Sequence, residues 1–160
     1  MSSTDAIADV TDEPIVHGAL VIAGACNAVA ALLHIGCILF GGPWYRFFGA
    51  GEHMARLAEA GHVMPTLVTS AIVLVLSGWA VVAWSGAGLL PRLPLLRTAL
   101  SLIAGIYLLR GLVGLYWVAE PVMGNSPMFW LWSSLICLSL GGLHTVGLWQ
   151  LNRARGPAPA

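Results

Sequence analysis

The sequence contains no lysine and few charged residues of any kind. Its 160 residues include 7 basic and 7 acidic side chains, which is 9% of the chain, whereas 58% is hydrophobic. A soluble domain carries roughly 25% charged residues, so this composition excludes a soluble surface and predicts an integral membrane protein. The formal net charge is zero, and without a basic field we expect no nucleic-acid partner.

Cysteine is also scarce, and no CxxC pair is present. Cys26, Cys37 and Cys137 all lie inside apolar stretches, where cysteine usually acts as a small apolar side chain. We therefore expect neither a disulfide nor a dithiol redox centre.

Long apolar stretches dominate what is present. A membrane-spanning helix needs about 20 mostly apolar residues, and backbone groups cannot remain unpaired in lipid, so each such stretch must be helical. The sequence therefore predicts an all-α integral membrane bundle of four transmembrane helices within a domain at 15–151. The expected spans are about 16–40, 63–84, 95–119 and 128–150.

The ends of the chain suggest an orientation. Residues 1–14 are acidic and contain no arginine, unlike the basic start of a signal peptide, so we expect a retained first span behind a disordered tail, and a second tail at 152–160. Because basic residues favour the cytoplasmic side, their distribution predicts a multi-pass inner-membrane protein with both termini cytoplasmic. The arginines near the termini are Arg92, Arg97, Arg153 and Arg155, against Arg46 and Arg56 on the other side.

The segment between the first two spans has the pattern of an amphipathic helix. In "WYRFFGAGEHMARLAEAG", apolar side chains recur at helical spacing and the charged side chains fall opposite them. This pattern predicts one interfacial helix at about 44–60.

Arg110 interrupts the third apolar stretch, "SLIAGIYLLRGLVGLYWVA". An unpaired arginine inside a membrane would cost several kcal/mol, so a partner is expected. Glu52 on the interfacial helix is the best acidic candidate, which predicts a buried Arg110–Glu52 ion pair.

Several other polar residues fall in the same outer half of the spans. If their helix faces converge, they form an outward-facing polar cavity with Arg110 at its floor. The alternative is that the hydroxyl and imidazole groups only bond neighbouring helices. The predicted ligand-binding set is Arg110, His34, Asn27, Glu52, Thr66 and Thr69.

Histidine raises the question of metal and haem. His34, His53 and His62, with Glu52, form a candidate zinc or copper set, although their spacing matches no tight ligand motif. Haem is not expected, because His34 and His144 lie in opposite halves of the membrane and two axial ligands must share one depth. The cofactor content otherwise stays open.

The segments "LHIGCILFGGPWYRFFGAGEHMARLAE" and "RLPLLRTALSLIAGIYLLRGL" resemble small four-helix inner-membrane proteins of bacteria with a DoxX-like architecture. This resemblance implies a fold and a compartment but no reaction. Runs of small residues at a spacing of four also predict close helix contacts, within the bundle or across a homodimer. Those runs are Ala23/Asn27/Ala31, Ser101/Gly105 and Cys137/Gly141/Thr145.

Three functions are compatible with these features. The first is binding or assisted transport of a small anionic or lipid-like ligand beside Arg110. The second is a membrane enzyme acting on a lipid or quinone-like substrate, with Glu52 and His34 as acid and base. The third is a structural or partner-binding membrane subunit.

Overall fold

The computed structural model describes residues 17–122 and 124–153. Within these ranges the chain is helical, with no strand, which confirms the all-α prediction. The helices are α2 (Gly18–Phe40), α3 (Gly42–Phe47), α4 (Glu52–Glu59), α5 (Val63–Ala87), α6 (Leu96–Ala119) and α7 (Pro127–Arg153). The predicted tails 1–14 and 152–160 lie outside the described residues, except that Asn152 and Arg153 end α7.

Four helices are long and apolar enough to cross a membrane: α2, α5, α6 and α7. The shortest has 23 residues, or about 35 Å at 1.5 Å per residue, against a hydrocarbon core of about 30 Å. Large apolar side chains remain on the surface, such as Leu39 and Leu74, which are 72% and 74% exposed. Such a surface suits lipid and not water, so the chain has the features of a multi-pass membrane protein.

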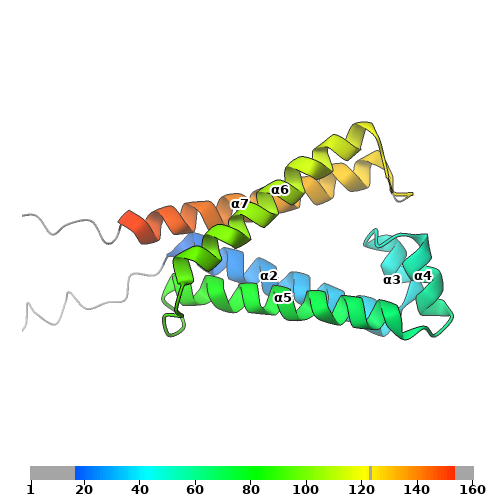
Figure 1. Ribbon diagram of the computed structural model, residues 1–160, viewed down its shortest axis with the longest axis horizontal. Coiled ribbons are helices and arrows are strands. Elements are labelled where there is room, and N and C mark those ends of the chain that lie inside the picture. Colours follow the sequence, from blue (N-terminus) through cyan, green and yellow to red (C-terminus); the bar gives the residue numbers. More distant parts are fainter. Residues whose placement is uncertain (1–16, 123, 154–160) are drawn as a thin grey trace, which may run out of the picture.

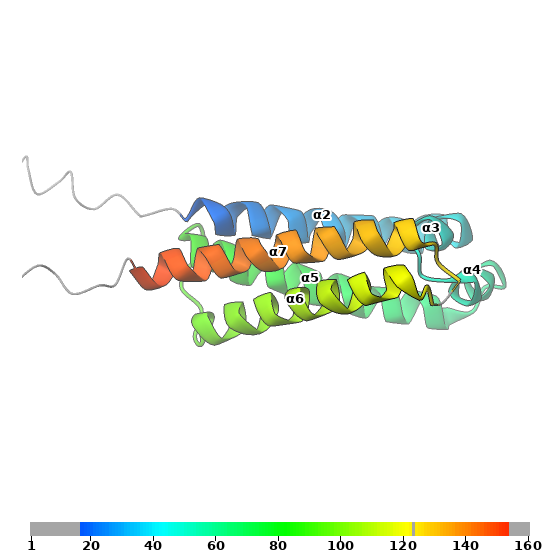
Figure 2. The same ribbon diagram turned by 90° about the horizontal axis from the view of Figure 1, so that it is seen from above.

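The four long helices form a V of two arms (Figure 1). The first arm consists of α2 and α5, and the second of α6 and α7. The arms meet at the vertex, where α2 begins and α7 ends, and they diverge toward α3 and α4 at the mouth. Figure 2 shows the same helices from above, running nearly along one axis. A cluster contributed by all four helices closes the vertex: Leu20, Ala87, Leu96, Leu100 and Leu151.

Glycines allow the helices to approach closely at the vertex. The Leu20 side chain of α2 lies against Gly86 of α5 and Gly147 of α7, and a Cβ atom on Gly86 would come within 2.8 Å of it. Close approach over small residues is the usual basis of helix packing in membranes, where lipid supplies little hydrophobic driving force. The vertex is therefore a tightly packed region.

Only some of the predicted small-residue runs lie in contacts between helices. Ala23, Asn27 and Ala31 are buried on α2, and Gly141 packs against α6. Ser101 and Gly105 are exposed instead, and nothing lies within 4 Å of a Cβ atom built on Gly105. A homodimer through that exposed face of α6 stays a prediction.

The segment between the first two spans forms two short helices, α3 and α4, so the prediction of one continuous helix at 44–60 was wrong. Gly49 and Gly51 break the helix with φ values of 72° and 91°, a region that glycine adopts without steric cost. The resulting pair of helices, here called the cap (residues 42–59), covers the mouth end of the first arm (Figure 1). The hydroxyls of Tyr45 and Thr69 bond at 2.9 Å and fasten α3 to α5.

Candidate functional site

A buried polar junction joins the two arms near the vertex. The Tyr107 hydroxyl of α6 donates to Asn27 Oδ1 of α2 at 2.5 Å. Asn27 Nδ2 donates to the Ala23 carbonyl at 3.0 Å and lies 3.4 Å from His144 Nε2 of α7. Because His144 Nδ1 donates to the Leu140 carbonyl at 2.8 Å, its Nε2 is left to accept from Asn27. These contacts satisfy the polar groups of the junction.

This junction changes the role expected for Asn27. The side chain is fully buried and its amide groups are already bonded, so it forms the floor of the space between the arms and does not face a ligand. Trp79 of α5 packs edge-on against Tyr107, with ring centroids 5.0 Å apart. Tyr107 was missing from the predicted set, and only the polar character of a residue inside a span could have drawn attention to it.

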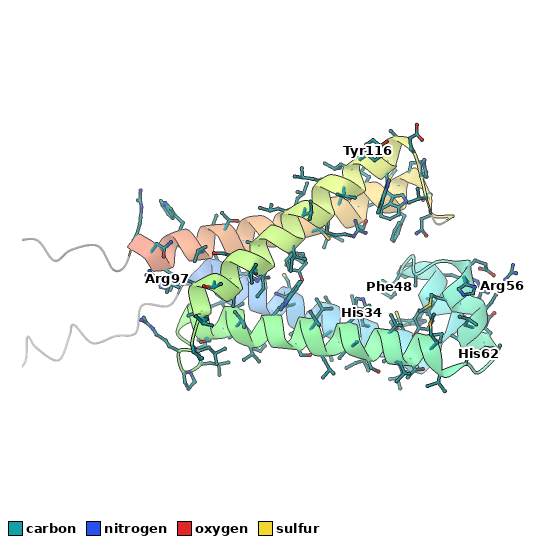
Figure 3. All side chains as sticks on the ribbon, viewed as in Figure 1. His34, Phe48, Arg56, His62, Arg97 and Tyr116 are labelled. Atoms are coloured by element: carbon teal, nitrogen blue, oxygen red, sulfur yellow. The ribbon has the colours of Figure 1, made fainter. Side chains whose placement is uncertain are left out.

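Two adjoining hollows follow the inner side of the first arm. One, of about 430 Å³, lies along α5 and has a wholly apolar lining: Val68, Ala71, Ile72, Val75, Leu76 and Trp79. The other, of about 370 Å³, lies beneath the cap and is lined by His34, Cys37, Tyr45, Phe48, Ala50, Met54, Val68, Thr69 and Ile72. Because they share Val68 and Ile72, we treat them as one inner cleft. Figure 3 shows His34 and Phe48 pointing into the space between the arms.

Arg110 lies on the face of α6 that is turned toward the first arm. Tyr107, one turn earlier, bonds Asn27, and side chains three or four positions apart share a helix face. The guanidinium carbon is 5.0 Å from the centroid of the Trp130 ring, a cation–π contact. A Cβ atom on Gly114 would lie 2.6 Å from Arg110 Nη1, so the guanidinium rests against that glycine, on the mouth side of Tyr107.

Two polar atoms beside Gly114 lack hydrogen-bond partners. Arg110 Nη1 and Ser134 Oγ are both shut off from solvent, and neither is bonded within the described residues. Ser134 is fully buried, and a Cβ atom on Gly114 would meet both side chains. Because buried polar atoms are nearly always paired, this pair of atoms marks a polar spot between α6 and α7 that lacks an acceptor.

The predicted ion pair between Arg110 and Glu52 is wrong. Glu52 accepts from Arg46 Nε at 2.7 Å and from Arg56 Nε at 2.9 Å. Its side chain is 51% exposed at the surface of the cap. Two arginines on the same short segment reach this carboxylate locally, Arg56 at the favourable i,i+4 spacing, whereas Arg110 is on the other arm.

Arg46 organises the charged groups of the cap. It bonds Glu52 through two nitrogens and Glu59 through two, with Arg46 Nη2 3.0 Å from Glu59 Oε2. Hydrogen bonds from Arg46, and then from Arg56, lower the pKa of Glu52 to about 2. The hydrogen bond from Arg46 also lowers the pKa of Glu59, and the two carboxylates raise the pKa of Arg46.

These shifts predict that the cap loosens in acid. A carboxyl whose pKa is lower in the folded protein stabilises the fold above its ordinary pKa of 4.5, and that contribution is lost as the pH falls toward about 2. We expect the protection of the α4 amides, measured as hydrogen exchange relative to the intrinsic rate at each pH, to fall over this range. A Glu52→Gln/Glu59→Gln variant should already exchange fast at neutral pH, and Glu120→Gln, outside the Arg46 network, should behave as wild type. Unchanged protection of these amides in wild type down to pH 2 would contradict this prediction.

The remaining predicted ligand residues separate into two groups. His34 lines the inner cleft, and its Nδ1 donates to the Ala30 carbonyl at 2.7 Å, which leaves Nε2 available. Thr69 is buried and bonded to Tyr45. Thr66 is exposed near the start of α5. Of the predicted set, the structure therefore leaves Arg110 and His34 on the inner faces of opposite arms.

The predicted metal ligands do not converge. His34 lines the inner cleft, whereas His53 and His62 are exposed on α4 and just before α5. In the part of the chain that the structure describes, no group of three or more His, Cys, Asp or Glu side chains is placed to hold a metal ion. The zinc or copper set drawn from these histidines was therefore wrong.

Comparison with known proteins finds no matching protein family, no matching curated protein and no matching solved structure.

Proposed function

We propose that this protein binds a ligand whose apolar body lies in the inner cleft along the first arm and whose one anionic group is held by Arg110 on the second arm. The observation that carries the proposal is the pair of buried atoms without partners, Arg110 Nη1 and Ser134 Oγ. A carboxylate or phosphate oxygen satisfies both a guanidinium and a hydroxyl donor, and arginine binds such groups through two parallel hydrogen bonds.

His34 lies at a suitable depth to assist from the other arm. Asn27 and Tyr107 are hydrogen-bonded and so share one depth. His34 is seven residues beyond Asn27, and Gly114, against which the Arg110 guanidinium rests, is seven residues beyond Tyr107. His34 and Gly114 are therefore both about 10 Å nearer the mouth than the hydrogen bond between Asn27 and Tyr107. The anionic group is bound at this level, and the apolar lining of the cleft takes up the rest of the ligand.

The proposal includes an orientation in a bacterial inner membrane. Among the described residues, Arg92, Arg97 and Arg153 lie at the vertex end, whereas Arg46 and Arg56 at the mouth are paired with glutamates. The preference of basic residues for the cytoplasm then puts the vertex and both termini inside. The inner cleft opens toward the outer half of the membrane.

The other two functions are less well supported. An acid–base pair needs both groups within hydrogen-bond reach of one point, but Glu52 is bound at the cap surface and His34 lines the cleft. A purely structural subunit would need no hollow between its arms. The inner cleft therefore favours binding.

The test is an equilibrium titration of palmitate, a long-chain carboxylate, into the protein in nanodiscs. A charge-assisted hydrogen bond contributes about 1.5–3 kcal/mol, so Arg110→Leu should weaken binding by about 10- to 100-fold. Ser134→Ala should weaken it less, because it removes one neutral donor. The matched control is Arg97→Leu, which removes an exposed arginine at the vertex (Figure 3) and should leave the affinity unchanged. Equal affinity of wild type and Arg110→Leu would refute the proposal.

A further inference from the structure

We infer that the ligand reaches the inner cleft sideways from the bilayer, between the arms, and that it is an anionic amphiphile with an acyl chain and not a water-soluble anion. This inference rests on the proposed function and adds the chemical class and the source of the ligand. It depends on two features of the molecule: a mouth that is bridged between the arms and carries no net positive charge, and a side that is apolar and open.

The mouth is bridged between the two arms. Asn125, in the loop before α7, donates from Nδ2 to the Gly49 carbonyl of the cap at 3.0 Å. The Phe129 ring of α7 lies directly against Gly49, where even a Cβ atom would collide with it. Tyr45 fastens the cap to Thr69 of α5. The side of the cleft that faces water is therefore covered by contacts from both arms.

The charges at the mouth give a free anion no favourable approach. Attraction of an anion from solution requires a net positive field at the opening. Among the described residues at this end, the fixed charges are two positive and three negative: Arg46 and Arg56 against Glu52, Glu59 and Glu120. Arg46 and Arg56 are moreover bound to carboxylates. A soluble anion would cross this region without electrostatic help.

The lateral side of the cleft, in contrast to the mouth, is apolar and open. The hollow along α5 is lined only by apolar residues, and two of them, Val68 and Val75, remain 44% and 48% exposed. The hollow runs from Val68 to Trp79, about 16 Å at 1.5 Å per residue, close to half of a hydrocarbon core of about 30 Å. Its length is therefore close to the thickness of one leaflet and suits one acyl chain. Such a chain would reach Arg110 without leaving an apolar environment.

The experiment uses the full chain in phosphatidylcholine vesicles with two photoreactive probes, a diazirine palmitate and a diazirine hexanoate. We expect palmitate to label residues along α5 and hexanoate to label them weakly. Ala71→Trp, which fills the α5 hollow, should lower palmitate labelling several-fold, and Val75→Trp provides a second such variant. Ser77→Trp adds the same bulk to an exposed position outside the hollow and should have no effect. Asn125→Ala, which removes the bond across the mouth, should also leave labelling unchanged.

The outcomes separate the two proposals. Strong labelling by hexanoate would overturn the lateral route, as would labelling that rises in Asn125→Ala and is unaffected by Ala71→Trp and Val75→Trp. In those cases a dependence on Arg110 would still support binding at the cleft. Palmitate labelling that is the same in wild type and Arg110→Leu would overturn the binding function itself.

Discussion

Replacing Gly141 by leucine is expected to force α6 and α7 apart and to destabilise the fold by about 3 kcal/mol, at the upper end of the cost of overpacking a core. A Cβ atom at Gly141 would lie 2.7 Å from Leu108 Cγ and 3.1 Å from the Leu108 backbone nitrogen. The leucine side chain can move, but the backbone cannot move without shifting the helix. The measurement is reversible unfolding in mixed micelles, followed by helix content.

The same helix offers a matched control. Gly142 is the next residue, and nothing lies within 4 Å of a Cβ atom built there, so Gly142→Leu should cost little. The contact is reciprocal, because Gly111 of α6 would place a Cβ atom 2.6 Å from Leu138 Cγ of α7. Gly111→Leu should therefore resemble Gly141→Leu. Equal stability of the Gly141 and Gly142 variants would show that the arm is not held by this close approach.

Replacing Asn27 by leucine should destabilise the fold by about 3 kcal/mol, because it leaves two buried polar groups without partners at about 1–3 kcal/mol each. These groups are the Tyr107 hydroxyl and His144 Nε2. Average bonds between membrane helices are weaker than this, but Asn27 joins three helices at once. Unfolding in mixed micelles measures the loss.

Two further variants test the reason for this loss. Removing both partners of a hydrogen bond is nearly neutral compared with removing one, so Asn27→Leu/Tyr107→Phe should recover part of the stability lost in Asn27→Leu. Asn152→Leu, at an exposed position on α7, should be close to wild type. If the loss in free energy of unfolding of the double variant equals the sum of the losses measured for Asn27→Leu and Tyr107→Phe alone, the two residues do not act together.

The variants at Gly141 and Asn27 also test how the fold positions the candidate site. The polar junction and the α6–α7 contact position the inner faces of the arms, and Arg110 lies on one of those faces. A variant that opens the second arm should weaken palmitate binding even when Arg110 is intact. Binding measurements should therefore accompany each stability measurement.

The sequence by itself determined the membrane class and the spans. Crossing a bilayer requires about 20 consecutive apolar residues, a local property that can be read along the chain, and the four predicted spans coincide with α2, α5, α6 and α7 to within a few residues. It also identified Arg110 and His34 as polar residues within apolar helices. The position of the cap could be predicted as well, but not its break at Gly49 and Gly51.

Only the tertiary structure decided which polar groups meet. Asn27 bonds partners that are 80 and 117 positions away, and no periodicity within one helix reports such a distance. Arg110 and Glu52 looked complementary by charge, but Glu52 is bound by arginines on its own segment. Which side chains pair between helices depends on how the helices are rotated and how far they diverge. This arrangement is set by the packing of Leu20, Gly86 and Gly147 at the vertex, and these residues come from three different helices.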